Sequence, residues 1–197
     1  MMWLLVGTSY LAGAVPFAHL VARGLGGLDV RSAGSRNVGA TNVLRVAGLS
    51  LAGLVLALDA GKGAAAVLAA RAVGIDEGGQ AAAAVAAVAG HVWPVWLRFR
   101  GGKGVAVAGG AFAVLAPLAT GMAVAVFVTV VSISRYVSCG SLVAAVALPL
   151  LALAAGASSV IVATAAGVAG LILARHRSNL DRLRAGTEWR LALRRRG

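Results

Sequence analysis

The run from Val46 to Val73 reads VAGLSLAGLVLALDAGKGAAAVLAARAV, and it decides the class of fold. As a helix it is long enough to cross a hydrocarbon core of about 30 Å, which takes roughly 20 apolar residues. Asp59 and Lys62 lie inside it, and their i,i+3 spacing places them on neighbouring positions of one helical face. The run therefore predicts a transmembrane helix with two adjacent opposite charges.

The composition of the whole chain agrees with a membrane protein. Of the 197 residues, 60% are hydrophobic and 12% are charged, which is typical of a polytopic membrane protein. The net charge of +12 also invites a nucleic-acid interpretation, but a nucleic-acid domain carries its basic residues on a soluble surface and not between long apolar runs. Nucleic acid is therefore excluded as a partner. Cys139 is the only cysteine, so no intramolecular disulfide can form, and we interpret it as a small packing residue.

Other apolar runs complete a count of seven transmembrane helices. They lie at about residues 3–21, 80–97, 104–115, 117–134 and 137–174, and the last is long enough for two helices separated by residues 156–159. The fourth span is short, so it either crosses by thinning the bilayer or is re-entrant. A cleavable signal peptide is the alternative for the first run, but its first basic residue, Arg23, follows the run instead of preceding it.

The distribution of charge predicts the orientation. Of the 18 Lys and Arg residues, all but Lys62 and Arg71, hence 16, fall in segments that this topology places in the cytoplasm, while the loop 74–79 carries only Asp76 and Glu77. We therefore expect an all-α integral membrane domain over residues 1–197, with the N-terminus outside and the C-terminus inside. The many Ala, Gly and Ser residues indicate closely packed helices or, equally well, the base composition of the genome.

Hydrophobicity does not explain the segment from Arg31 to Arg45, RSAGSRNVGATNVLR. Its glycines permit unusual backbone geometry, its hydroxyl and amide groups can donate hydrogen bonds, and its three arginines add fixed positive charge, which together suit phosphate. The alternative is an ordinary basic cytoplasmic loop made of turn residues. We call this segment the polar island.

The predicted topology places three more polar segments on the same cytoplasmic face, residues 98–104, 135–141 and 175–184, and we expect them to meet the island in one site. Phe99–Gly104 is a glycine-rich loop before a helix, where N–H groups attract phosphate, although it lacks the spacing of a nucleotide-binding P-loop. His176 and Asn179 lie three residues apart in the last segment. A lone interfacial His is more often a hydrogen-bonded structural residue than a catalyst.

At this point the chain resembles a known family, the PlsY family of acyl-phosphate-dependent glycerol-3-phosphate acyltransferases, over nearly its whole length. The segments that carry the resemblance are Gly34-Ser35-Arg36-Asn37-Val38-Gly39-Ala40-Thr41-Asn42 with Arg45; Asp59, Lys62 and Gly63; Gly90-His91, Pro94 and Phe99-Arg100-Gly101-Gly102-Lys103-Gly104; Arg135-Tyr136-Val137-Ser138 through Ser141; and Arg175-His176-Arg177-Ser178-Asn179 with Arg182, Gly186 and Glu188. Their occurrence in one order makes coincidence improbable. Two positions depart from the family pattern: Arg36 stands where a glycine is usual, and Arg100 replaces the more usual Lys.

The resemblance implies an enzyme of the bacterial inner membrane that moves a fatty acyl group from acyl phosphate to the 1-hydroxyl of glycerol 3-phosphate. The implied partners are these two substrates, membrane lipid and an enzyme that produces acyl phosphate; no metal or other cofactor is expected. His176 and Asp181 also have the His-x4-Asp spacing of other acyltransferases, which we interpret as accidental because the accompanying glycerophosphate motif is not seen.

Carried over by position, the resemblance implies roles for individual residues. Ser35, Arg45 and Lys103 would bind and polarise phosphates, and His176 and Asn179 would act beside them. The expected substrate-binding residues are Gly34, Asn37, Gly39, Thr41, Asn42, Gly101, Gly102, Gly104 and Ser141. The resemblance also implies that the acceptor's own phosphate, in preference to His176, takes the hydroxyl proton.

Two other classes of function remain open on the sequence. A transporter of organic phosphate is motivated by Asp59 and Lys62, because charges inside a membrane often mark a translocation path. The odd number of spans and the lack of a visible internal repeat count against it. A noncatalytic subunit whose basic face binds an acidic soluble partner is the second alternative.

Overall fold

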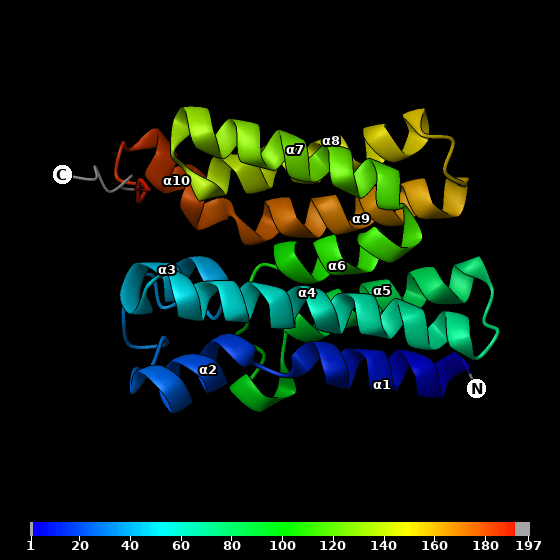
Figure 1. Ribbon diagram of the computed structural model, residues 1–197, viewed down its shortest axis with the longest axis horizontal. Helices are drawn as coiled ribbons and strands as arrows, with labels where there is room; N and C mark the ends of the chain where they lie inside the picture. Colours follow the sequence, from blue (N-terminus) through cyan, green and yellow to red (C-terminus); the bar gives the residue numbers. More distant parts are fainter. Residues whose placement is uncertain (1, 192–197) are drawn as a thin grey trace. The chain divides into compact units, whose positions relative to one another are not determined.

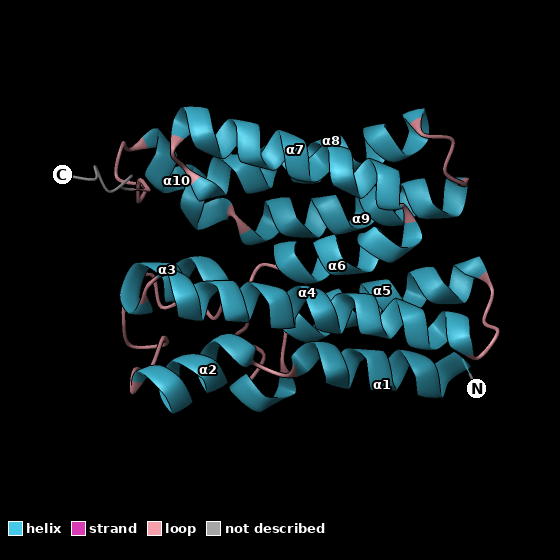
Figure 2. Ribbon diagram, viewed as in Figure 1, coloured by secondary structure: helices cyan, strands magenta, loops and turns pink. Residues whose placement is uncertain are grey.

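The computed structural model describes residues 2–191, and this part of the chain is helical and contains no β-strand (Figure 2). The predicted all-α class is confirmed. By its internal contacts the chain divides into two compact units, residues 1–117 and residues 118–197. Each unit is described by itself, and the prediction of one polytopic domain stays a prediction.

The first unit is built around its longest helix, α4 (Figure 1). Its elements are α1 (Met2–Ala14), α2 (Phe17–Gly26), α3 (Ala40–Ala47), α4 (Leu49–Ala72), α5 (Glu77–Val92), the 3-10 helix η1 (Val95–Leu97) and α6 (Val105–Leu115). Helix α4 contacts all five other α-helices of the unit. The quoted run 46–73 is interrupted near its start by Gly48, whose φ of +88° separates α3 from α4.

The first predicted span is broken in the middle. Helix α1 ends at Ala14 and α2 begins at Phe17, because Pro16 has no N–H for the helical ladder and its ring crowds the preceding turn. The two helices together still form one apolar segment of 25 residues. The break exposes the carbonyl of Val15, which accepts a hydrogen bond from Lys62 Nζ at 2.8 Å.

The two ends of the first unit differ in charge. The start of α1 lies beside the α4–α5 turn, since Met2 approaches Gly79, and this turn carries Asp76 and Glu77. Asp76 also begins α5 by accepting a hydrogen bond from the backbone N–H of Gly79 at 2.8 Å. The polar island lies at the opposite end of α4, next to α3 (Figure 1).

Glycines allow two helix pairs in the first unit to approach closely. A Cβ at Gly63 of α4 would overlap the carbonyl of Val107 in α6, and a Cβ at Gly110 of α6 would overlap the carbonyl of Ala60 in α4. Gly13 and Gly90 have the same relation in the α1–α5 pair. At these positions glycine serves packing, so base composition alone does not explain it.

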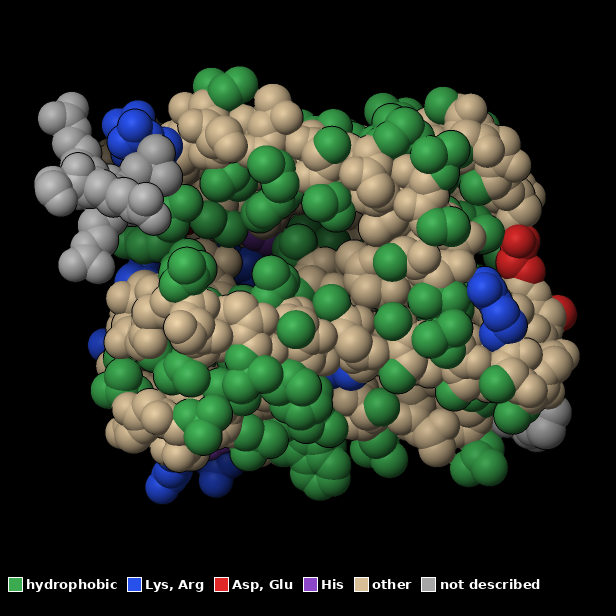
Figure 3. All heavy atoms as spheres, viewed as in Figure 1, with side chains coloured by type: hydrophobic (Ala, Val, Ile, Leu, Met, Phe, Trp, Pro, Cys, Tyr) green, Lys and Arg blue, Asp and Glu red, His purple; other side chains and the backbone are tan. Residues whose placement is uncertain are grey.

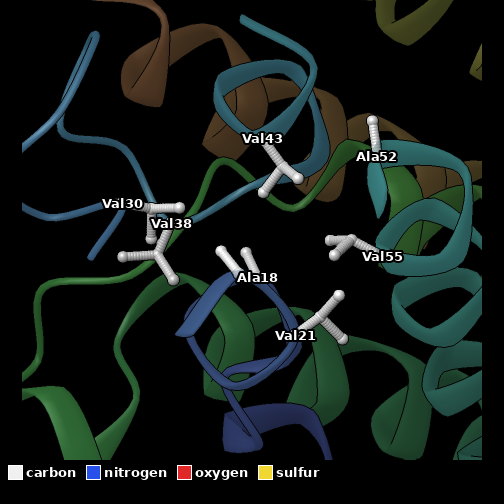
Figure 4. Close-up of a cluster of buried hydrophobic side chains, with 8 residues drawn as sticks. Ala18, Val21, Val30, Val38, Val43, Ala52 and Val55 are labelled. Carbon is white, nitrogen blue, oxygen red and sulfur yellow. The ribbon is translucent and has the colours of Figure 1, made fainter. Parts of the chain in front are cut away.

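A small apolar core holds the island to the helices (Figure 4). Val30, directly before the island, and Val38 and Val43 within it point toward α2 and α4, and all three are buried. The remaining members of this core are Ala18, Val21 and Ala22 of α2 and Ala52 and Val55 of α4. Apolar anchors inside the polar island therefore fix the loop that carries its polar groups.

The second unit contains four helices, α7 (Pro117–Ser134), α8 (Val137–Ala154), α9 (Ser159–Arg175) and α10 (Arg177–Arg184). Helix α8 packs against α9, and α10 follows α9 at an angle of 55°. The Ser158 hydroxyl begins α9 by accepting a hydrogen bond from the N–H of Ile161. The predicted breaks at 115–117 and 156–159 are confirmed.

Five helical segments of residues 2–191 are long and apolar enough to cross a membrane, and α9 with α10 makes a sixth if that bent pair is one span. Helix α6 has 11 residues and so a length of about 16 Å, roughly half of a hydrocarbon core. The exposed side chains of the long helices are largely hydrophobic, as expected of a surface that faces lipid (Figure 3). Leu56 of α4, Val128 of α7 and Leu150 of α8 are examples.

Candidate active site

The polar island is a compact loop folded around the side chain of Asn42. This amide is 2% exposed and donates hydrogen bonds to the carbonyls of Val30 at 3.0 Å and Ala33 at 3.1 Å. Its Oδ1 accepts a hydrogen bond from the backbone N–H of Ser35 at 2.8 Å. Asn42 thus fixes the backbone that presents Ser35, while its direct contact with substrate stays a prediction.

Two residues of the island have left-handed backbone conformations. Gly34 has a φ of +59°, and a Cβ there would overlap the side chains of Asn42 and Val46. Arg36 has the same φ of +59°, a conformation that costs a residue with a side chain about 1–2 kcal/mol. The departure of Arg36 from the usual glycine therefore carries backbone strain, although its side chain is exposed.

We expect Arg36→Val to lower the stability of the protein by about 1–2 kcal/mol, because a β-branched residue resists this conformation most strongly. Arg36→Gly is expected to leave stability within about 1 kcal/mol of wild type, since the strain it relieves is offset by added entropy of the unfolded chain. Thermal unfolding of the purified protein in detergent measures both. Equal thermal unfolding midpoints for Arg36→Val and Arg36→Gly would contradict backbone strain at position 36.

Helix α3 forms the C-terminal part of the island and carries Arg45 in its last turn. Gly39 precedes the helix in an extended conformation, and Thr41 is exposed in its first turn. Asn37 is half-buried in the loop before it. These residues share one end of the first unit, as the sequence predicts.

The glycine-rich loop from Arg98 to Gly104 folds back against the end of α5. The N–H of Gly101 donates to the carbonyl of Val92 at 3.1 Å, and the N–H of Gly102 donates to the carbonyl of His91 at 3.0 Å. These two N–H groups therefore shape the loop and are not directed at a ligand. The other predicted phosphate donors are Lys103 and the N–H groups at the start of α6, which begins after Gly104 at φ +87°.

The island and the glycine-rich loop meet, as predicted. Gly102 lies against the backbone carbonyl of Val38, with no room for a Cβ. Both residues also line a small cavity of about 10 Å³, which has room for about one water molecule. Two of the four predicted polar segments are thus brought together inside the first unit.

The other two segments belong to the second unit. The backbone N–H of Leu191 donates to the carbonyl of Arg135 at 2.8 Å, which places the C-terminal segment beside the α7–α8 turn. Ser141 is buried in the first turns of α8, where its hydroxyl donates to the carbonyl of Val137 at 2.9 Å. The prediction that the segments of both units form one site stays a prediction.

His176 stands at the junction of α9 and α10 and is 2% exposed. Its Nδ1 lies 2.8 Å from the carbonyl of Ile172, and a carbonyl can only accept, so Nδ1 carries the proton and Nε2 has the lone pair in the neutral ring. Asp181 is instead three-quarters exposed and 3.9 Å from Arg184. This geometry supports the interpretation of His-x4-Asp as accidental.

Asn179 is held by Glu188, a residue that the sequence analysis placed in a motif but not in the site. Its amide donates to one carboxylate oxygen of Glu188 at 2.7 Å, and Arg182 Nε donates to the other at 2.7 Å. Partial burial works against ionisation of Glu188, but the hydrogen bonds from Asn179 and Arg182 outweigh it and hold the pKa of this carboxyl below its usual range. The hydrogen bonds from Asn179 and Arg182 to the ionised Glu188 carboxylate are therefore fully formed at neutral pH, and they weaken as the pH falls and the carboxylate becomes protonated.

Asp29 is another carboxylate that holds a predicted polar segment, in this case the island. Asp29 accepts three hydrogen bonds from the side chain of Arg31 and a further one from its backbone N–H. The Arg31 hydrogen bonds are the main cause of a pKa of Asp29 far below its usual range. No group of three or more His, Cys, Asp or Glu side chains that could hold a metal ion occurs within residues 2–191.

Comparisons with known proteins agree with this arrangement of segments. The family model described as glycerol-3-phosphate acyltransferase matches residues 3–186. A glycerol-3-phosphate acyltransferase from Synechococcus sp. (strain CC9902) is 47% identical over 188 residues, which cover 95% of this chain and 94% of that protein. The protein of the same name from Geobacter sulfurreducens is 41% identical over 185 residues and covers 94% of this chain and 95% of its own length.

Two solved structures share the fold. One is the glycerol 3-phosphate form of PlsY (YgiH), an integral membrane glycerol 3-phosphate acyltransferase, with 36% identity, a TM-score of 0.91, and coverage of 97% of this chain and 96% of that chain. The other is its lysophosphatidic acid form, with 36% identity, a TM-score of 0.89, and coverage of 97% and 95%. Together with the family match and the apolar helices, these findings identify a multi-pass membrane protein that belongs to the glycerol-3-phosphate acyltransferase family.

Proposed function

We propose that this chain transfers a fatty acyl group from acyl phosphate to the 1-hydroxyl of glycerol 3-phosphate, which gives lysophosphatidic acid and inorganic phosphate, the first step of bacterial phospholipid synthesis. The observation that carries the proposal is the match over nearly the whole chain to an acyltransferase solved in a glycerol 3-phosphate form and in a lysophosphatidic acid form. The expected place of action is the bacterial inner membrane. An enzyme that makes acyl phosphate is its expected partner.

The chemistry needs cations, because both substrates carry phosphate. Lys103 and Arg45 are proposed to hold the two anions in near-attack geometry, with Ser35 as a hydroxyl donor on the island. The acceptor oxygen attacks the acyl carbon, the bond from this carbon to the phosphate oxygen breaks, and phosphate leaves with the bonding pair. No covalent enzyme intermediate is required, because phosphate is already a good leaving group.

Ser141, His176 and Asn179 are proposed to orient the acceptor, while the acceptor's own phosphate takes the hydroxyl proton and passes it to the leaving phosphate. The carbonyl of Ile172 fixes the His176 ring, and Glu188 fixes the Asn179 amide. Both arrangements suit groups whose task is orientation.

We expect His176→Ala to lower turnover without removing the acidic limb of the pH–rate profile. A substrate phosphate has its second ionisation at about pH 6, and an unperturbed His titrates at about pH 6.5. The acidic limb therefore persists in the His176→Ala profile only if it belongs to the substrate. The profile of kcat from about pH 5 to 8 decides between them. Disappearance of the limb in the variant would make His176 the general base.

We also propose seven spans with the N-terminus outside. Support comes from the unequal ends of the first unit, where the start of α1 and the acidic turn lie together and the basic island lies opposite. A tag after Gly197 should be cytoplasmic and one at Gly78 external. A membrane-impermeant reagent applied to intact cells should therefore label only the tag at Gly78, and the reverse pattern would refute the orientation.

The function is tested with purified protein, glycerol 3-phosphate and, in parallel, acyl phosphate, acyl-CoA and acyl-carrier protein as donors. We expect lysophosphatidic acid from acyl phosphate alone; equal rates with acyl-CoA would reject the proposed donor. Turnover by the purified chain would also reject a noncatalytic subunit. The argument for a transporter rested on charges inside the membrane, and it is weakened because Asp59 and Lys62 pair with each other at 2.8 Å.

A further inference from the structure

A cluster of buried polar side chains lies beneath the glycine-rich loop, and the proposed reaction makes no use of it. Asp59 and Lys62 come from α4 and His91 from α5, and they are 2%, 7% and 8% exposed. Most of their neighbours are apolar. Groups of this kind are costly in such surroundings unless every one of them is paired.

The contacts within this cluster link its three members. Lys62 Nζ lies 2.8 Å from Asp59 Oδ1, donates to the Val15 carbonyl at 2.8 Å and lies 3.1 Å from His91 Nδ1. An ammonium group has three protons, and these are its three partners. His91 Nδ1 is also 3.6 Å from Asp59 Oδ1. The cluster therefore links α4 and α5 to the break between α1 and α2.

His91 connects this cluster to the glycine-rich loop. Nδ1 of His91 faces Lys62 and Asp59, so Nε2 is on the other edge of the ring. Nε2 is the atom that lies against Gly102, so closely that a Cβ on Gly102 would overlap it. The backbone carbonyl of His91 also accepts the Gly102 N–H. One residue thus holds the loop through both its ring and its backbone.

The loop needs such an anchor, because its backbone is strained just before the two glycines. Arg98 has a φ of +50° and Phe99 a φ of +61°, and conformations of this kind persist only where the surroundings fix them. Lys103 follows Gly102 directly, and α6 begins two residues later. Any movement of Gly102 is therefore passed on to Lys103 and to the start of α6.

We propose that Asp59, Lys62 and His91 are positioning residues, which fix Gly101 and Gly102 against the end of α5 and thereby set where Lys103 and the start of α6 meet a substrate phosphate. The identity of that phosphate rests on the proposed function. The anchoring of the loop does not.

The test compares His91→Ala and Lys62→Met with wild type in two measurements on the purified full-length protein. The first is amide hydrogen exchange of residues 98–104 by mass spectrometry, which reports the hydrogen bonds of Gly101 and Gly102 without any substrate. We expect exchange to become at least about tenfold faster in both variants. The second is kcat/KM with acyl phosphate and glycerol 3-phosphate, which we expect to fall by about ten- to a hundredfold per folded molecule.

Val67→Ala is the matched control, because it opens a cavity in the same helix α4 at a fully buried residue outside the cluster. It should lower the unfolding temperature while exchange of residues 98–104 and kcat/KM stay at wild-type values. His91→Ala is the decisive variant, since it keeps both charges of the Asp59–Lys62 ion pair. Lys62→Met instead leaves Asp59 as a buried unpaired charge and can fail to fold.

If exchange of residues 98–104 in His91→Ala stays at the wild-type rate, the proposed anchor is wrong. It is also wrong if Val67→Ala speeds this exchange as much as His91→Ala does. Faster exchange with an unchanged kcat/KM would overturn the link to the site. If wild type itself forms no lysophosphatidic acid, the proposed function fails, and the exchange measurement still decides whether the cluster holds the loop.

Discussion

Lys103→Met is expected to reduce acyl transfer by at least about a hundredfold, to below detection in most assays, while the protein is made and purified in normal amounts. Lys103 is half-buried and lies in the glycine-rich loop two residues before α6, where a fixed positive charge would face a substrate phosphate. Removal of one preorganised group that stabilises developing charge typically costs a hundredfold to a thousandfold in rate. Formation of lysophosphatidic acid from acyl phosphate measures the loss.

Two variants separate this effect from general loss of charge. Arg23→Met removes an exposed basic residue from the last turn of α2 and should leave the rate within about twofold of wild type, because exposed charges contribute little. Arg45→Ala removes the other proposed cation and should resemble Lys103→Met. Full activity of Lys103→Met would remove Lys103 from the site.

The second large effect is expected from Gly110→Ala, a change of a single methyl group. The added Cβ would overlap the carbonyl of Ala60, so α4 and α6 must separate. Overpacking of this kind typically costs about 1–3 kcal/mol, and more where the obstacle is backbone that cannot rotate away. We expect a sharp drop in the yield of monodisperse protein and in its unfolding temperature.

Gly109→Ala is the matched control, on the same helix and one residue away. A Cβ at Gly109 meets no atom within 4 Å, and alanine favours a helix by up to about 1 kcal/mol relative to glycine. This variant should therefore be as stable as wild type or slightly more stable. Equal damage from both substitutions would show that the close approach of α4 and α6 is not what limits stability.

Local sequence signals predict much of the fold. The spacing of Asp59 and Lys62 predicts their pairing, which the distance of 2.8 Å confirms. Pro117 and the Gly156 region correctly mark two helix boundaries, because proline and glycine act on the chain locally. Pro16 gives the same signal inside the first apolar run, where the length of the run predicts one helix and the structure has two.

The geometry of the candidate site is harder to predict from sequence, because the groups that hold its loops in place come from distant parts of the chain. His91 is a solitary histidine in an alanine-rich helix, and nothing in its spacing indicates Lys62, 29 residues away, as a partner. The Gly101 and Gly102 N–H groups were expected to face an anion, but the carbonyls at the end of α5 use them. Backbone hydrogen bonds of this kind depend on how a loop folds back and leave no mark in the residue types.

The order in which the charged cluster is synthesised bears on how the protein enters the membrane. Helix α4 brings a carboxylate and an ammonium into lipid together, and each alone would cost about 2.5–3.5 kcal/mol at mid-bilayer. Because Asp59 and Lys62 neutralise each other within one helical turn, α4 can leave the translocon before α5 has been made. The Val15 carbonyl belongs to the helical segment that is synthesised before α4, and His91 belongs to α5, which is synthesised after it. Each charge therefore finds a partner at the moment of its insertion, with no need of a helix still on the ribosome.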